Sequence, residues 1–199
     1  MRQAWSDAVR TLGGTPDPGD LEERYAEPHR RYHNTKHVLA VVRDAAVLAE
    51  ALGLSAQERA LLTLAACAHD VVYDSKPGDD ERASAAWARS HLTDLAPEHV
   101  DRVSSLVLAT ITHSSDDELA RALLDADLAI LGAPQQEYDE YRVAVRAEYA
   151  MYDDEAWRAG RAKVLSTLLS RDPLYVTKPA RELWESTARA NMARELQAL

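Results

Sequence analysis

The sequence predicts an all-α protein, and three observations support this prediction. Apolar residues recur at helical spacing through most of the chain. Strand signals are nearly absent, because no Asn-Gly or Asp-Gly pair separates runs of alternating hydrophobicity. The chain has 199 residues, of which 46% are hydrophobic, enough to bury a core without disulfides or a structural metal. We therefore predict an all-α bundle that forms one domain over residues 1–199.

No helix is predicted for the amino-terminal segment. Residues 1–12 alternate charged and apolar types, with no apolar run that could serve as a signal peptide. Residues 13–19 are rich in Gly and Pro and predict a surface loop. No uncharged apolar stretch is long enough to span a bilayer. We therefore expect a soluble, cytoplasmic protein without a membrane partner.

Two neighbouring helices form the best-defined part of the prediction. The first runs from Thr35, its expected N-cap, to a stop at Gly53, with its apolar residues in one stripe. Ser55 and Glu58 then form a capping-box pattern that opens the second helix. This second helix runs to Ala68 and is apolar on nearly every side. It should therefore be central and buried.

Further helices follow an acidic loop at residues 74–80, where Lys76-Pro77-Gly78 breaks the pattern. Helical spacing resumes over residues 81–92, 97–108, 119–131, 138–152, 157–168 and 183–196. The segment 138–152 is a stripe of tyrosines, which is more often core than a cofactor site.

The charge balance limits the partners of the chain. Lys and Arg number 23 against 33 Asp and Glu, a net charge of −10. A chain this acidic does not attract a polyphosphate backbone, so no nucleic-acid polymer is expected, although a nucleotide could bind at a local metal site. The single cysteine, Cys67, cannot form an internal disulfide, which fits a reducing compartment, and we expect it to pack as a buried hydrophobe.

Three short motifs supply residue types that bind metals. The segment 32–37 begins Tyr-His and ends in a second histidine four residues after the first, a spacing that can bring both to one helix face. His69 and Asp70 are adjacent at the end of the most buried helix, where an unpaired carboxylate would be costly. Asp125 and Asp127 lie inside an apolar run. Asp125 can equally be a surface acid of its helix.

These residue types indicate a catalytic rather than a structural metal. Histidine nitrogens with carboxylate oxygens suit manganese, iron, cobalt, zinc or magnesium. The lack of a thiolate cluster excludes a structural zinc finger. Two His and two Asp leave positions open on a six-coordinate ion for water and for a substrate oxygen. We therefore expect one divalent metal ion. The histidines His29, His91 and His99 are interpreted as surface or hydrogen-bonded residues.

The ordered set of His37, His69-Asp70 and Asp127 resembles the HD superfamily of metal-dependent phosphohydrolases. The whole chain is similar to a bacterial group of that superfamily of about this length. The segments that carry the similarity are 31–33, 69–74, 79–81, 112–113, 125–132, 146–149 and 174–177. The resemblance implies an HD-domain-like helical bundle. It also implies the metal ligands His37, His69, Asp70 and Asp127.

The histidine motif is also similar to the one that opens the catalytic domain of cyclic nucleotide phosphodiesterases. In that family the first histidine donates a proton and the second binds metal, which makes His33 the general acid and His37 a ligand. Leu follows that family's last metal-binding Asp, as it follows Asp127 here, which favours Asp127 over Asp125. Tyr73 stands where that family has a further histidine, so cyclic nucleotides are not a specific expectation.

Together these features predict hydrolysis of a phosphomonoester or phosphodiester, with a small phosphorylated substrate such as a nucleotide. His33 would protonate the leaving oxygen, and Asp80 or Glu81 would orient the attacking water. The candidates for holding the substrate phosphate are Lys36, His113 and Arg146. Arg146 has an alternative interpretation, as a member of ion pairs on a solvated helix face.

Two alternatives come from other functional classes. The first is a two-metal oxygenase on the same fold, with His91 and His113 as additional ligands. The second is a non-catalytic module that binds a nucleotide as a signal. One metal ion per chain would set aside the first, and turnover of any phosphate ester would exclude the second.

Overall fold

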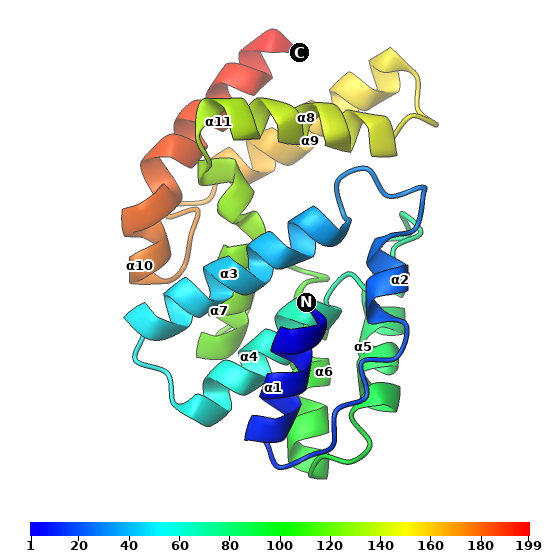
Figure 1. The fold of residues 1–199 in the computed structure, drawn as a ribbon. Helices are drawn as coiled ribbons and strands as arrows, with labels where there is room; N and C mark the ends of the chain where they lie inside the picture. The colour runs from blue at the N-terminus through cyan, green and yellow to red at the C-terminus, as the bar shows by residue number, and fades with distance from the viewer. The chain divides into compact units, whose positions relative to one another are not determined.

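The computed structural model describes residues 1–199, and the protein is entirely helical, with no strand (Figure 1). The all-α prediction is confirmed. Contacts between Cα atoms group the chain into two compact units, residues 1–127 and 128–199, so the single domain over residues 1–199 stays a prediction. None of the helices combines the length and apolar character needed to cross a membrane.

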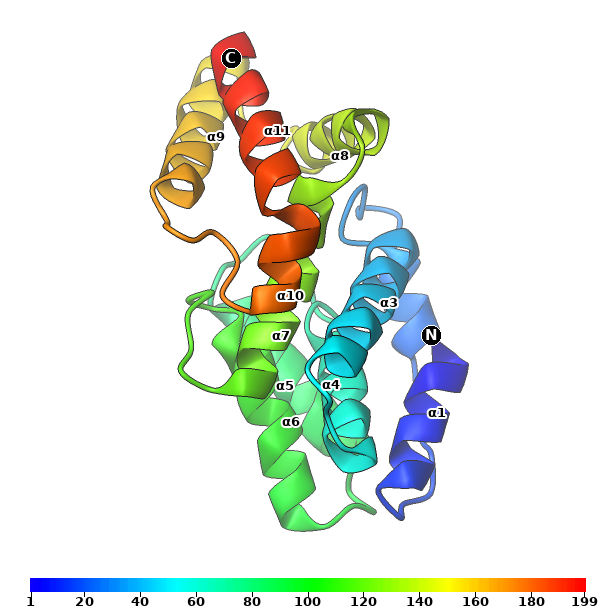
Figure 2. The same cartoon turned by 90° about the vertical axis from the view of Figure 1, so that its left-hand side faces the viewer.

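The first unit is built around one buried helix. Its helices are α1 (Arg2–Thr11), α2 (Leu21–Tyr25), α3 (Thr35–Ala51), α4 (Ala56–Ala68), α5 (Asp79–His91), α6 (Pro97–Ala109) and α7 (Glu118–Asp127). The helix α4 packs against α1, α3, α5, α6 and α7, and Figures 1 and 2 both show it beside α3. The predicted capping box of Ser55 and Glu58 opens α4. Residues 64–68 are fully buried, so the predicted central helix is confirmed.

The structure corrects several predicted boundaries in this unit. Residues 1–12, for which no helix was predicted, contain α1, which buries Trp5 and Val9 on one face. The N-cap of α3 is Asn34 rather than Thr35, because the Asn34 side chain accepts a hydrogen bond from the Lys36 backbone N–H. The helix predicted over residues 119–131 ends as an α-helix at Asp127, after which the chain tightens into a 3₁₀ turn.

The second unit consists of the 3₁₀ turn η1 (Leu128–Gly132), α8 (Gln135–Glu148), α9 (Asp154–Leu169), α10 (Lys178–Ala180), the π-helical turn η2 (Arg181–Glu185) and α11 (Ser186–Ala198). The helix α11 packs against η1 and α9. The tyrosine stripe is only partly core, because Tyr138 is buried whereas Tyr152 is exposed.

A buried polar cluster joins α8, α9 and α11. The Glu195 carboxylate accepts two hydrogen bonds from the Arg161 guanidinium, at 2.8 and 3.0 Å, and one from the Tyr138 hydroxyl at 2.5 Å. Burial alone would raise the pKa of Glu195, but these hydrogen bonds outweigh it and hold the pKa below its usual value.

This cluster should make the stability of the second unit depend on pH. Since the folded pKa of Glu195 lies below the unfolded value of about 4.3, its contribution is present above that value and is lost as pH falls through the folded pKa. We expect Glu195→Gln to lower the free energy of unfolding at pH 7 by about 3–5 kcal/mol, and by less at pH 3. Urea unfolding followed by circular dichroism at both pH values measures this difference. The control is Glu182→Gln, because the Glu182 side chain is exposed beside Lys178. Equal losses in the two variants would contradict the prediction.

Candidate metal centre

Three helix ends of the first unit bring the predicted metal-binding residues together. His37 lies in the first turn of α3, His69 is the C-cap of α4 with Asp70 directly after it, and Asp127 is the last residue of α7. The helix α3 packs against both α4 and α7. Side chains at helix ends can point along the helix axes, so the adjacent residues His69 and Asp70 reach one point although they would diverge inside a helix.

The side-chain atoms converge closely. The Nε2 atoms of His37 and His69 lie 3.1 Å apart. Asp70 Oδ2 lies 3.3 Å from His37 Nε2 and 3.1 Å from His69 Nε2. Asp127 Oδ1 lies 3.3 and 3.5 Å from the same two nitrogens. The ligand atoms of His37, His69 and Asp70 all lie within 4.8 Å of one another, so this group could bind a metal ion.

These separations fit the coordination shell of one divalent cation. Two ligands that each lie about 2.1 Å from an ion are about 3.0 Å apart at a right angle and about 3.4 Å apart in a tetrahedron. The five measured separations range from 3.1 to 3.5 Å. Both imidazoles are buried, and lone pairs that converge in a buried place are costly unless a cation or protons lie between them.

Hydrogen bonds to groups outside the cluster orient two of its members, His69 and Asp127. His69 Nδ1 donates to the Ala66 carbonyl oxygen at 2.8 Å. Because a carbonyl only accepts, Nδ1 carries the proton, and the Nε2 of the neutral ring presents its lone pair to the cluster. His113 Nε2 donates to Asp127 Oδ2 at 3.0 Å, while Oδ1 faces the two imidazoles. The His113 backbone has a φ of +47°, in the left-handed region, which few non-glycine residues adopt.

The cluster is strongly coupled electrostatically. Burial lowers the pKa of His37 and His69, but the carboxylates of Asp70 and Asp127 outweigh burial and raise it. Burial raises the pKa of both carboxyl groups, whereas their imidazole partners hold it well below the usual range. When no ion is bound, protons on the imidazole rings therefore offset the negative charge of the two carboxylates. A cation that binds here displaces protons from the rings.

His33 lies next to the cluster. Its ring centroid is 5.3 Å from that of His37, and its ring stacks on Tyr73 with centroids 4.2 Å apart. The side chain is half-buried. His33 thus lies near the ligand atoms without belonging to the group of three that could bind a metal.

Asp80 and Glu81 lie in the first turn of α5 and accept hydrogen bonds from the backbone of the acidic loop. Asp80 Oδ2 accepts hydrogen bonds from the backbone N–H groups of Asp74 and Lys76, at 3.0 and 2.8 Å. Glu81 Oε2 accepts one from the N–H of Gly78 at 2.6 Å. Gly78 has a φ of +87°, which favours glycine at this turn. The role of either carboxylate in orienting water stays a prediction.

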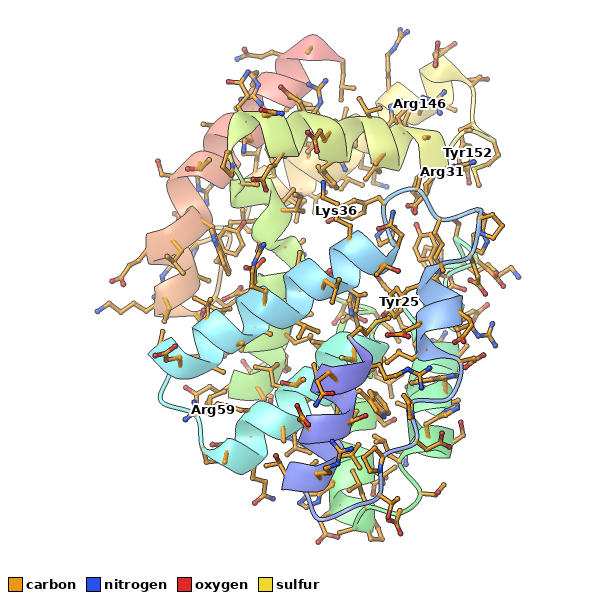
Figure 3. The ribbon with its side chains drawn as sticks, in the orientation of Figure 1. Tyr25, Arg31, Lys36, Arg59, Arg146 and Tyr152 are labelled. Carbon is orange, nitrogen blue, oxygen red and sulfur yellow. The ribbon has the colours of Figure 1, made fainter.

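The two cationic candidates for holding phosphate belong to different units. Lys36 is exposed in the first turn of α3. Arg146 belongs to the second unit and donates to Asp154 at 2.9 Å and to the carbonyl oxygens of Tyr149 and Tyr152, so it joins α8 to the start of α9 (Figure 3). This network corresponds to the alternative interpretation of Arg146, although the ion pair is with Asp154. Contact of either cation with a substrate stays a prediction.

The surroundings of Asp125 differ from those expected, whereas those of His91 and His99 do not. The interpretation of Asp125 as a surface acid is wrong, since it is 2% exposed. His91 stacks on Trp87 with centroids 4.0 Å apart and hydrogen-bonds within α5. His99 pairs with Gln57 at 2.8 Å. These contacts agree with the interpretation of both histidines as hydrogen-bonded residues.

Cys67 tests the burial of the helix that carries His69. Its side chain is fully buried, and burial raises the pKa of the thiol to about 12. Since the thiolate is the reactive form, we expect labelling of the folded protein by an aromatic disulfide reagent at pH 8 to be more than about 100-fold slower than in 6 M guanidinium chloride. Stopped-flow absorbance measures both rates. Comparable rates would show that the end of α4 is open to solvent.

No protein-family model, curated protein or solved structure matches the chain.

Proposed function

We propose that this chain is a metal-dependent phosphohydrolase of the HD superfamily, with an HD-domain-like helical bundle. The proposed ligands of one divalent ion are His37, His69, Asp70 and Asp127. The observation that carries the proposal is at three helix ends, where two imidazole nitrogens lie 3.1 Å apart and one oxygen of each carboxylate lies 3.1 to 3.5 Å from both nitrogens. The order of these residues along the chain, which resembles that superfamily, supports the same conclusion.

The donor set supports a borderline or hard ion, namely manganese, iron, cobalt, zinc or magnesium. When bound, such an ion neutralises phosphate charge and lowers the pKa of water toward about 7. The protein supplies the remaining functions. His33, beside the cluster, donates a proton to the leaving oxygen. His113 orients Asp127 through its hydrogen bond, and the exposed ammonium of Lys36 attracts the substrate phosphate.

The test is a substrate screen with defined metals. The protein is stripped with a chelator, reloaded with each of the five ions in turn, and incubated with nucleotides, sugar phosphates and bis(4-nitrophenyl) phosphate. We expect release of phosphate or nitrophenolate that needs the ion and stops on renewed chelation. Turnover that survives chelation, or none with any ion, would contradict the proposal. Tight nucleotide binding without turnover would favour the non-catalytic module instead.

A further inference from the structure

We propose that Arg30 is a positioning residue of this centre, because its buried guanidinium donates hydrogen bonds to the backbone of both His33 and Asp70. The inference rests on the proposed function, in which His33 is the proton donor and Asp70 a metal ligand. Arg30 itself does not touch the ligand atoms; it would act by fixing how far the donor lies from the ion.

One nitrogen of Arg30 bridges the two segments. Nη1 donates to the carbonyl oxygens of both His33, at 2.9 Å, and Asp70, at 2.7 Å. Nη2 donates to the next carbonyl, that of Val71, at 2.9 Å. The side chain is completely buried. Since the guanidinium is shielded from water, these hydrogen bonds constrain the separation between the loop before α3 and the turn after α4.

The groups around the guanidinium belong to the same network. Glu27 accepts from Arg30 Nε at 3.1 Å and balances its charge. The rings of Tyr25 and Tyr73 lie 5.1 and 5.8 Å from Arg30 Cζ, within range of cation–π attraction. Tyr73 is also the ring on which His33 stacks. Arg30 therefore supports both the backbone and the ring surroundings of His33.

Tyr25 binds the backbone N–H of Asp70. Its hydroxyl donates to the Cys67 carbonyl at 3.0 Å and accepts from the Asp70 N–H at 3.2 Å. Asp70 is thus held at its backbone nitrogen by Tyr25 and at its backbone oxygen by Arg30. With both backbone groups fixed, the direction in which the Asp70 side chain leaves the turn is fixed as well.

An arginine suits this position for a chemical reason. The carbonyl oxygens of Asp70 and Val71 lie in the turn after α4, outside the helix, and a planar guanidinium with five N–H groups can bind several such acceptors in fixed directions. Arg30 uses its Nε, Nη1 and Nη2 atoms for four hydrogen bonds. A lysine would keep the charge but has a single nitrogen with three rotating donors, so it cannot reach the same set in the same plane.

The test compares Arg30→Lys with a matched control, Arg59→Lys. Arg59 also donates from its side chain to a backbone carbonyl, that of Leu54 at 2.8 Å, but at the amino-terminal end of α4 (Figure 3). Three quantities are measured: hydrogen–deuterium exchange of the metal-free protein, affinity for Co²⁺, and steady-state hydrolysis of a phosphate ester that the wild type turns over.

We expect Arg30→Lys to speed exchange in the segments 31–37 and 69–73 and to weaken Co²⁺ binding by about 10- to 100-fold. The value of kcat should fall with KM nearly unchanged, because the proton donor is displaced while the exposed phosphate-binding groups are not. Arg59→Lys should leave all three quantities at wild-type values. In Arg30→Ala, 20 mM guanidinium should restore Co²⁺ affinity, whereas 20 mM urea should not.

Wild-type exchange and Co²⁺ affinity in Arg30→Lys would overturn the inference. So would a lower melting temperature with unchanged Co²⁺ affinity, since Arg30 would then only stabilise the fold. If Arg30→Ala is unfolded, Arg30→Lys decides by the same readouts. If the wild type binds no Co²⁺ and hydrolyses no ester, the proposed function fails, and exchange in the metal-free protein alone decides whether Arg30 ties the two segments together.

Discussion

Asp70→Ala should abolish binding of the proposed metal ion. The Asp70 carboxylate oxygen lies against both imidazoles, at 3.1 and 3.3 Å, so its loss removes one ligand and the charge that balances the ion. Losing a residue that merely supports a ligand typically costs about 10- to 100-fold in metal affinity. We therefore expect a loss above about 100-fold, measured by elemental analysis after dialysis against buffered Zn²⁺ or Mn²⁺.

The control for this experiment is Asp74→Ala. Asp74 lies four residues later in the same loop, and its exposed carboxylate pairs only weakly with Lys76, at 3.5 Å. It should keep the full metal content. Asp127→Ala tests the fourth proposed ligand, because Asp127 Oδ1 faces the same two nitrogens. Full metal content in Asp70→Ala would refute the proposed centre, whereas full content in Asp127→Ala alone would reduce it to His37, His69 and Asp70.

The sequence could predict the buried helix and the residue types of the centre because both depend on local pattern. The apolar run before His69 identifies α4 without any tertiary information. Hydrophobic pattern does not distinguish Asp125 from Asp127, because α7 is buried on nearly every side and both carboxylates lie in an apolar run; only the family resemblance of the Leu after Asp127 favoured that residue. What separates them is the end of α7 at Asp127, which leaves Oδ1 free to face the imidazoles.

Other features depend on contacts between distant segments, and the sequence alone could not predict them. The helix α1 was missed because its charged residues obscure the buried face, which forms only against α4. Arg30 was missed because an arginine beside His29 and Arg31 is typical of a solvated surface. Its burial arises from the carbonyls of Asp70 and Val71, which lie 40 and 41 residues further along the chain.

His33→Ala should slow hydrolysis by about 10²–10⁴-fold, the usual contribution of a general acid, while the protein keeps its metal. The ring of His33 lies 5.3 Å from that of His37, near enough to reach a substrate oxygen beside the ion. His37→Ala should instead lose the metal, because His37 Nε2 lies among the converging ligand atoms. Metal content and kcat, measured on the same preparations, separate the two roles. His99→Ala, which removes a histidine paired with Gln57, is the control and should match the wild type.

The leaving group makes this prediction specific to proton donation. Nitrophenolate leaves readily without a proton, so the loss in His33→Ala should shrink for nitrophenyl esters and stay large for alkyl phosphates. A purely structural role for His33 would slow both classes of substrate alike. Wild-type activity of His33→Ala on alkyl phosphates would exclude the acid role. A metal-free His33→Ala protein would place His33 among the ligands. The proton donor would then have to be sought elsewhere, first at His113, whose Nε2 already donates to Asp127.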